Sequence, residues 1–375
     1  MEVARYKVTV DGKPLADSLL ELLTRLEVRE SDSDATVAAL RFVLGRKQTG
    51  EFSPLDDELF HPLSALTVAL AAPGGELEQL FSGYVTHVRP HFEALPAACY
   101  VEVLAMDAAV LLDAEERVAA YPDATDAEAA EDIFGRYGIA FSGESTPARH
   151  EERRQLLVQR GTDWEFVRQL ARRNGFCCYL EPDSRTGKVM AYFRRRALGG
   201  SPQPVLAARS DVSNLVWLDL QLVGTGPVRW SGAAIDPLAK RLLRTEGNPA
   251  AKPMGKQALA DQVEEGLSST RAQAASRLLR EPPPLDAALQ SAGTGATDAS
   301  LLAVEARGEV DCGLYQSLLR ARRPVLIRGV GRTFAGAYYV RTVRTTLDGG
   351  ALTQAFVALR NATGATGPSL GNGGA

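Results

Sequence analysis

Two segments of this chain, beginning at residues 81 and 334, carry nearly the same sequence. Each spells Phe-x-Gly and then Tyr-Val-x-x-Val-Arg, with two extra residues before Tyr-Val in the second segment. The matching residues are Phe81, Gly83, Tyr84, Val85, Val88 and Arg89 in the first segment, and Phe334, Gly336, Tyr339, Val340, Val343 and Arg344 in the second. Solenoid repeats recur every ~20–50 residues. A repeat at this longer distance instead predicts two related β-domains in one chain.

Each segment continues through a turn into another strand-like run, at residues 100–105 and 355–359. We therefore expect the backbone of residues 81–105 to superpose on that of residues 334–359, as paired strands of two β-barrels with the same topology. Gly83 and Gly336 should occupy equivalent positions, where a strand bends or another backbone comes close. Two segments in unlike folds, or in one shared sheet, would make the repeat a coincidence.

The length and composition predict a globular protein of two to three domains, since the chain has 375 residues, 45% of them hydrophobic and 23% charged. A net charge of −4 argues against dedicated nucleic-acid binding, which usually needs a basic protein. No run of ~20 apolar residues is present, so we expect no membrane span. The N-terminus lacks a signal-peptide pattern, which predicts synthesis in the cytoplasm. We expect the four cysteines to be buried free thiols.

The hydrophobic periodicity divides the chain into β, α+β and β parts. Residues 1–106 contain five or six strand patterns, enough for a small barrel, although Leu19–Leu26 fits either a short helix or a strand. Residues 107–200 contain two helices, opened by the capping boxes Thr125 with Glu128 and Thr162 with Glu165. Strand-like runs follow both helices, so this part is an α+β insertion between two β-domains.

Strand patterns return in residues 201–362, the second β-domain. A polar stretch at about 245–300 interrupts it; residues 257–280 favour a helix, whereas Pro282–Pro284 and Gly293–Gly295 favour a loop. The Gly-rich residues 363–375 are predicted to be disordered. The fold class is therefore mainly β, with two related β-barrel domains and an α+β insertion.

The sequence shows no catalytic motif. His87 and His91 have a spacing that suits metal ligands on a helix, but they follow a β-pattern and enclose Pro90, so the rings would not share a helical face. Two arginine groups, at 194–196 and 320–328, lack interleaved aromatic residues for nucleic-acid binding. We interpret them as solvated strand ends or as contacts with an acidic neighbouring subunit. We expect a protein that is not an enzyme and has no cofactor and no metal site.

The second predicted helix carries the most specific pattern of the chain. Asp163, Trp164, Phe166, Leu170, Ala171 and Gly175 spell Asp-Trp-x-Phe-x-x-x-Leu-Ala-x-x-x-Gly. This pattern resembles the signature of phage late-control D proteins, which also occurs in the hub part of type VI secretion spike proteins. The order of barrel, insertion and barrel is similar as well, so the resemblance covers residues 3–362.

The resemblance implies a tail-hub fold and the baseplate hub of a contractile injection machine: a phage tail, a tailocin or an extracellular injection system. Three chains with two barrels each would form a pseudo-hexameric homotrimer, which joins a sixfold inner tube to a threefold spike. The implied partners are a separate spike protein, an inner tube or tube-initiator protein, and baseplate wedge or LysM-type adaptor proteins. The protein would act as a component of the assembled particle. The alternatives are a hub fragment of a type VI spike protein and, from a different class, a β-rich hydrolase or sugar-binding module.

Overall fold

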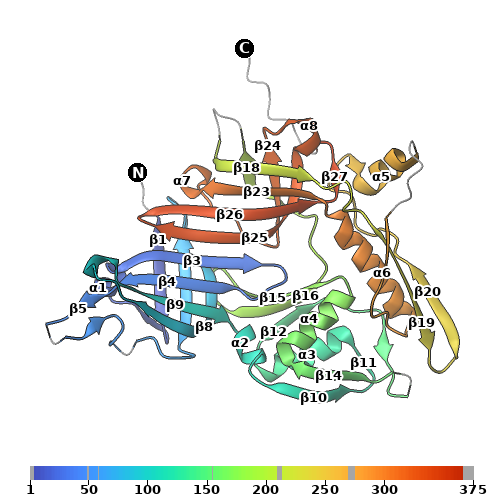
Figure 1. The fold of residues 1–375 in the computed structure, drawn as a ribbon, viewed down its shortest axis with the longest axis horizontal. Coiled ribbons are helices and arrows are strands. Elements are labelled where there is room, and N and C mark those ends of the chain that lie inside the picture. Colours follow the sequence, from blue (N-terminus) through green and yellow to red (C-terminus); the bar gives the residue numbers. More distant parts are fainter. Residues whose placement is uncertain are drawn as a thin grey trace, which may run out of the picture.

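The computed structural model describes residues 4–48, 50–57, 59–153, 155–208, 213–268 and 275–365. Its fold is mainly β with an α+β insertion, as the sequence predicts (Figure 1). The largest sheet has 13 strands and is long and strongly curved, and the insertion lies beneath one end of it in Figure 1. Among the described helices, none is long and apolar enough to cross a membrane.

Six strands near the N-terminus form the N-terminal half-sheet. They are β1 (Arg5–Val10), β3 (Leu23–Ser31), β4 (Val37–Val43), β7 (Ala65–Ala71), β8 (Glu78–His91) and β9 (Tyr100–Asp107). Their spatial order is β3-β4-β9-β8-β7-β1, and all neighbours are antiparallel. Alternate residues of each strand face one hydrophobic core, which explains the period of two in the sequence. The ambiguous segment Leu19–Leu26 contains both predicted elements, since α1 (Asp17–Leu20) ends where β3 is about to begin.

The short elements of this half-sheet lie in its loops. They are β2 (Lys13–Pro14), β5 (Gly45–Arg46), β6 (Phe52–Ser53) and the 3-10 helix η1 (Pro96–Ala98). The helix η1 closes the long hairpin between β8 and β9.

Six further strands form the C-terminal half-sheet. They are β17 (Gln203–Ala207), β18 (Leu215–Leu222), β23 (Val304–Asp311), β24 (Pro324–Arg328), β25 (Gly336–Asp348) and β26 (Ala351–Arg360). Their spatial order, β18-β23-β26-β25-β24-β17, repeats that of the N-terminal half-sheet when the strands of each are numbered along the chain. The one difference is that β17 runs parallel to β24, whereas β1 runs antiparallel to β7.

The two half-sheets are joined edge to edge. Strand β25 pairs with β24 only over Gly336–Tyr339, and its remaining length pairs with β3, from Thr342 opposite Ser31 to Asp348 opposite Arg25. Eight strands therefore follow one another from β18 at the top of Figure 1 to β8 near the bottom. The two related β-domains that the sequence predicts are therefore present and continuous with each other, because β24 covers only the first part of β25 and leaves an edge that β3 occupies. The shared topology of the halves nevertheless argues against a coincidental repeat.

The α+β insertion lies between β9 and β17. Its helices are α2 (Ala109–Leu112), α3 (Asp126–Arg136) and α4 (Asp163–Arg173); its strands are β10 (Glu116–Tyr121), β11 (Ala124–Thr125), β12 (Ala140–Gly143), β13 (Arg149–His150), β14 (Leu157–Thr162), β15 (Cys177–Pro182) and β16 (Val189–Arg194). Both predicted capping boxes are confirmed, since each threonine hydroxyl accepts the N–H of the glutamate three residues later. The apolar faces of α3 and α4 pack with β15 and β16 in a core of their own.

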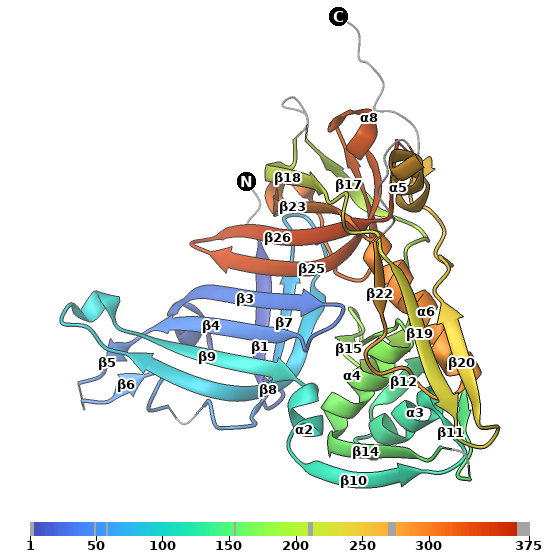
Figure 2. The ribbon, with the colours of Figure 1, turned by 45° about the vertical axis from the view of Figure 1, so that its right-hand side comes forward.

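The connection between β18 and β23 forms a lateral arm, visible at the right of Figure 2. It contains β19 (Arg229–Asp236), β20 (Arg241–Glu246), β21 (Gln257–Ala258), α5 (Leu259–Ser268), β22 (Ser276–Leu278) and α6 (Asp286–Leu301). The loop predicted at Gly293–Gly295 is wrong, because these residues lie inside α6. A Cβ on Gly295 would lie 2.6 Å from the Cα of Gly175. The glycines therefore allow α6 to touch the insertion backbone to backbone, which offsets their low helix propensity.

The C-terminal segment is partly ordered. Strand β27 (Ala362–Thr363) pairs with β21, and the N–H of Gly364 donates to the carbonyl of Thr333. The prediction of disorder from residue 363 onward is therefore wrong at its start, and residues 366–375 lie outside the described residues. Two short helices, α7 (Cys312–Tyr315) and α8 (Gly331–Phe334), fill the turns before β24 and β25.

Candidate assembly interface

The Tyr-Val-x-x-Val-Arg segments occupy the same register in the two half-sheets. Val85 lies opposite Ala105 across the β8–β9 pair, and Val340 lies opposite Ala358 across the β25–β26 pair. A β-bulge then follows in both strands, at Thr86 and at the corresponding residue of β25, before pairing resumes. Val88 and Arg89 therefore correspond to Val343 and Arg344. A bulge at the same place in both copies fixes this correspondence residue by residue.

The Phe-x-Gly parts of the two segments do not correspond. Counting back from the two tyrosines, Gly83 matches Tyr338, and Phe81 matches Gly336. Phe334 lies in α8 instead of a strand. The expectation that Gly83 and Gly336 are equivalent is therefore wrong. Gly83 is required because a Cβ there would overlap the carbonyl of Met106, whereas Gly336 has a positive φ of 141°.

A second pair of bulges extends the shared register to four strands. It lies after Leu23 in the β3–β4 pair and after Leu215 in the β18–β23 pair. Across the four strands, one row of neighbours is Val28, Ala38, Ala105 and Val85, and the corresponding row is Leu220, Ala306, Ala358 and Val340. Strands β3, β4, β9 and β8 thus correspond to β18, β23, β26 and β25. Each half-sheet presents the same four-stranded surface.

The β25–β3 pair is the joint at which these surfaces meet. On its core side it brings together Leu347 and Leu26, both buried. On its outer side, Arg344 Nε lies 3.9 Å from a Glu27 oxygen. The joint therefore combines an apolar row with charges of opposite sign, as stable antiparallel pairs do.

A cluster of buried charged side chains stabilises the β25–β3 joint. The Arg320 guanidinium contacts Glu30 at 3.1 Å and Glu78 at 3.4 Å, and both carboxylates belong to the N-terminal half-sheet. Arg322 lies 3.4 Å from Glu181 of the insertion and donates from Nε to the Ser31 carbonyl at 2.9 Å. Arg320 and Arg322 are therefore neither solvated nor free to meet another subunit, which corrects the sequence interpretation for these two residues, whereas the side chains of Arg195 and Arg323 are exposed. Arg320 and Arg322 pair inside their own chain with both other parts of the fold.

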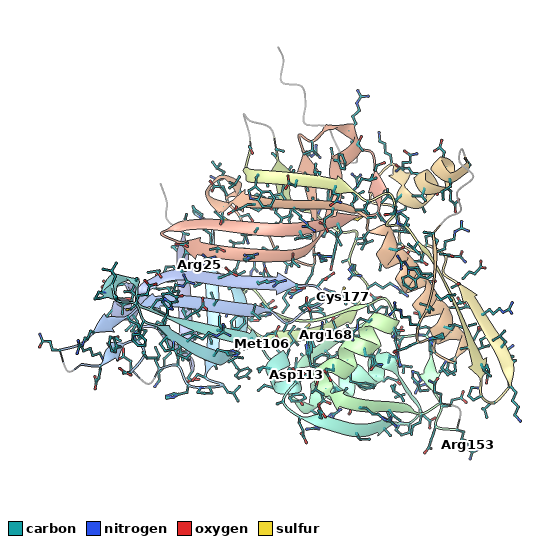
Figure 3. All side chains as sticks on the ribbon, in the orientation of Figure 1. Arg25, Met106, Asp113, Arg153, Arg168 and Cys177 are labelled. Atoms are coloured by element: carbon teal, nitrogen blue, oxygen red, sulfur yellow. The ribbon has the colours of Figure 1, made fainter. Side chains whose placement is uncertain are left out.

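The electrostatics of the cluster favour its charged form. Burial raises the pKa of Glu181, but the charges of Arg322, Arg320 and Arg323 outweigh it and hold that pKa below its usual value. A similar pair lies alongside, where Arg196 Nε donates to Asp32 at 2.8 Å. The thiol of Cys177, which is labelled in Figure 3 and begins β15, contacts the Asp32 carboxylate at 3.5 Å. Removing one partner of a buried ion pair leaves an uncompensated buried charge, which is unfavourable. The cluster therefore stabilises the contact between the two half-sheets and the insertion.

The signature residues hold the insertion together. In α4, the side chains of Trp164, Phe166, Leu170 and Ala171 are buried in the core of the insertion. Asp163 is buried as well, and its carboxylate accepts hydrogen bonds from Gln159 at 2.7 Å and Tyr137 at 2.8 Å. Burial and this carboxylate raise the pKa of Tyr137 to about 12. Gly175, with a φ of 68°, ends the helix and makes the contact with Gly295.

The histidines of the repeat lie on the exposed end of β8. His87 contacts the neighbouring Thr86 hydroxyl at 3.0 Å, and His91 contacts Glu93 at 3.0 Å. Within the described residues, no group of three His, Cys, Asp or Glu side chains is arranged to hold a metal. The four cysteines are buried and unpaired.

Sequence reasoning missed the carboxylates of the charge cluster. Glu30 and Arg320 are 290 positions apart, and no local pattern marks either of them as a partner of the other. The sequence carries no signal for this pairing, because it depends on which strands of the two half-sheets meet.

Solved structures of known proteins share this architecture. The family model described as "Alg8 N-terminal domain" matches residues 1–190. A comparison with curated proteins gave no match. Among solved structures, the chain is similar to the 43 kDa tail protein of prophage MuSo2 from Shewanella oneidensis, with a TM-score of 0.65 and 12% identity over 96% of this chain and 98% of that one.

Two further structures have the same fold. The tail protein from Neisseria meningitidis MC58 gives a TM-score of 0.64 at 13% identity, over 96% of this chain and 97% of that one. The E. coli c3393 protein, described as a component of the type VI secretion system, gives 0.56 at 14% identity, over 97% and 80%. At such identities the likeness is one of fold, and it extends over nearly the whole chain.

Proposed function

We propose, from the fold shared with phage tail proteins, that this chain, which belongs to the Alg8 N-terminal domain family, is the baseplate hub of a contractile injection machine. The machine is a phage tail, a tailocin or an extracellular injection system. In it, three copies of the chain join a sixfold inner tube to a threefold spike. The role is structural instead of enzymatic, and the chain acts in the assembled particle.

The observation that carries this proposal is the duplicated four-stranded surface. Three chains with two such surfaces each supply six similar units from a threefold assembly. One face can then meet a sixfold tube or tube-initiator protein, while the chain as a whole keeps the threefold symmetry of a spike. Baseplate wedge or LysM-type adaptor proteins would bind around the outside.

The copy number tests the proposal. Light scattering of the purified protein should give the mass of three chains, and electron microscopy of the assembled particle should show three copies at the base of the tube. A stable dimer, or six copies per baseplate, would contradict the symmetry-adaptor role.

A hub fragment of a type VI spike protein is the second candidate. It is favoured by the likeness to the E. coli c3393 protein, which extends over 97% of this chain. The two candidates differ in the size of the natural polypeptide. An immunoblot of the source cells should show a band near 40.2 kDa for a separate hub, and a much larger band for a hub fused to its spike.

A further inference from the structure

The eight-strand run of the sheet has two unpaired edges. Strand β18 pairs with β23 only, so its other edge has no partner among the described strands. Strand β8 pairs with β7 as far as Tyr84, and from Thr86 to His91 it has a described strand partner only in β9. In Figure 1 these edges lie at opposite ends of the strand stack, β18 at its top and β8 at its bottom.

The internal joint shows how these two edges fit each other. Because β8 corresponds to β25 and β18 corresponds to β3, the open edges are the two sides of a second β25–β3 joint. We propose that β8 of one copy pairs antiparallel with β18 of the next copy, in the register of the internal joint; this inference rests on the trimeric hub proposed above. Transferring the register places Val88 opposite Leu222, Arg89 opposite Gln221, and His91 opposite Asp219 of the neighbouring copy.

Burial at corresponding positions supports this pairing. Leu26 and Leu347 are 0% and 8% exposed at the internal joint. Phe92, which corresponds to Leu347, is 54% exposed. Leu222 is 40% exposed although Glu30, its counterpart, is buried. Apolar side chains are thus exposed on both open edges at positions that the internal joint covers, and pairing would remove them from water.

Charge at the open edges is complementary in the same way. In the internal joint, Arg344 approaches Glu27. The corresponding residues at the open edges are Arg89 and Asp219, one on each edge and both exposed. The proposed register therefore creates an ion pair between copies where the chain already has one within itself.

Pro90 limits which strands this edge accepts. The Asp32 N–H donates to the Arg341 carbonyl at 3.1 Å, so the backbone groups of Arg341 point toward β3. In an antiparallel pair every second residue has this orientation, and Thr345 is therefore one of the β25 residues whose N–H points toward β3. Pro90 corresponds to Thr345 and has no N–H, so the joint between copies has one hydrogen bond fewer. A proline on an open edge also discourages pairing with unrelated strands, which leaves selection to the matching side chains.

Cysteine crosslinking tests the register. Arg89 and Gln221 correspond to Arg344 and Arg29, a directly opposed, non-hydrogen-bonded pair, whose short Cβ separation suits a disulfide. After mild oxidation, the R89C/Q221C variant should run as a covalent trimer on a non-reducing gel, with a dimer as its intermediate. The R29C/R344C variant is the matched control, and it should form its disulfide within a single chain.

A one-position shift distinguishes register from mere proximity. The R89C/L220C variant places the second thiol on the opposite face of β18 and should give little crosslink. A trimeric mass without the R89C/Q221C crosslink, or equal crosslinking of the shifted variant, would overturn this inference while leaving the trimeric hub standing. A monomeric or dimeric mass without crosslinks would contradict both proposals.

Charge reversal gives a second measurement that needs no disulfide. The R89E variant should raise the dissociation constant of the trimer about fivefold per interface, since it places like charges opposite each other. Adding D219R should restore the original value. If the double variant stays as weak as R89E, Arg89 and Asp219 do not meet.

Discussion

The two half-sheets share their strands but differ in their connections. In the N-terminal half-sheet, only residues 32–36 link β3 to β4, whereas the corresponding strands β18 and β23 are linked by residues 223–303, which form the lateral arm. In the central hairpins, the longer connection belongs to the N-terminal half-sheet. Residues 92–99 link β8 to β9, whereas only Gly349-Gly350 link β25 to β26. The bulges and the core keep the strands in register, so large changes of length are confined to loops.

One pair of corresponding positions, Glu30 and Leu222, shows how the two half-sheets differ at their edges. Glu30 is buried and paired with Arg320, whereas its counterpart Leu222 is exposed and apolar. The first position closes a joint inside the chain, where a charge can be matched by a fixed partner. The second lies at the end of the sheet, where an apolar side chain can be covered by another molecule.

The largest expected effect concerns the insertion, which follows β9. Trp164 is buried in its core, and Trp164→Ala should lower the free energy of unfolding by about 3–5 kcal/mol and abolish particle assembly. Denaturant unfolding and electron microscopy of particles measure the two outcomes. A variant with an unchanged melting temperature and normal particles would show that Trp164 does not hold the insertion together.

The second prediction separates the internal joint from the open edge. Arg320→Ala leaves Glu30 buried without its main partner and should destabilise the chain by about 3 kcal/mol. Leu222→Ala, at the position corresponding to Glu30, should cost less than about 1 kcal/mol in the isolated chain because Leu222 is partly exposed. Comparable shifts of the denaturation midpoint for both variants would contradict this distinction.

A third comparison uses two corresponding valines. Val343 is fully buried between β26 and β3, so Val343→Ala should cost about 2 kcal/mol from two lost methyl groups and the remaining cavity. Val88 is only half-buried, and Val88→Ala should cost less in the isolated chain. In the trimer, the two substitutions should lower the free energy of unfolding by similar amounts. Denaturant unfolding at protein concentrations below and above the dissociation constant of the trimer would measure both values. A difference that persists in the trimer would place Val88 outside any interface.

The smallest effect concerns acid. Because the pKa of Glu181 is lowered in the folded chain, its contribution to stability is present above its ordinary pKa of 4.5 and is lost as the pH falls through the lowered value. The wild-type chain should therefore lose more stability between pH 7 and pH 3.5 than Glu181→Gln does. Denaturation midpoints at the two pH values give the comparison, and equal losses would show that Glu181 does not stabilise the joint.

Local signals in the sequence predicted the local structure well. The capping boxes at Thr125 and Thr162 located both helices of the insertion, because the hydroxyl and glutamate that satisfy the first turn lie three residues apart. Alternation likewise located β4, β8 and β9, since one face of each is buried. The tail-hub fold was implied by the signature on α4, not by these patterns.

The sequence failed where structure depends on distant backbone. Gly293 and Gly295 are signs of a loop in isolation, but contacts with Gly247 and Gly175 explain why they lie in α6. The arginines of the charge cluster are signs of a polar surface unless the carboxylates packed against them are known. The Phe-x-Gly motif was misleading because similar letters occupy different register positions. Predicting any of these features requires knowing which distant segments of the chain pack against each other.

The paired bulges also bear on the ancestry of the chain. A one-residue insertion or deletion within a strand turns every following side chain to the opposite face, so such changes rarely survive once a core has formed. The extra residues of β8 and β25, and those of β3 and β18, stand at the same places. We infer that they were present in a single ancestral unit before its gene was copied. Substitution has since altered the strands, and distant relatives will be aligned more reliably by their bulges than by their residues.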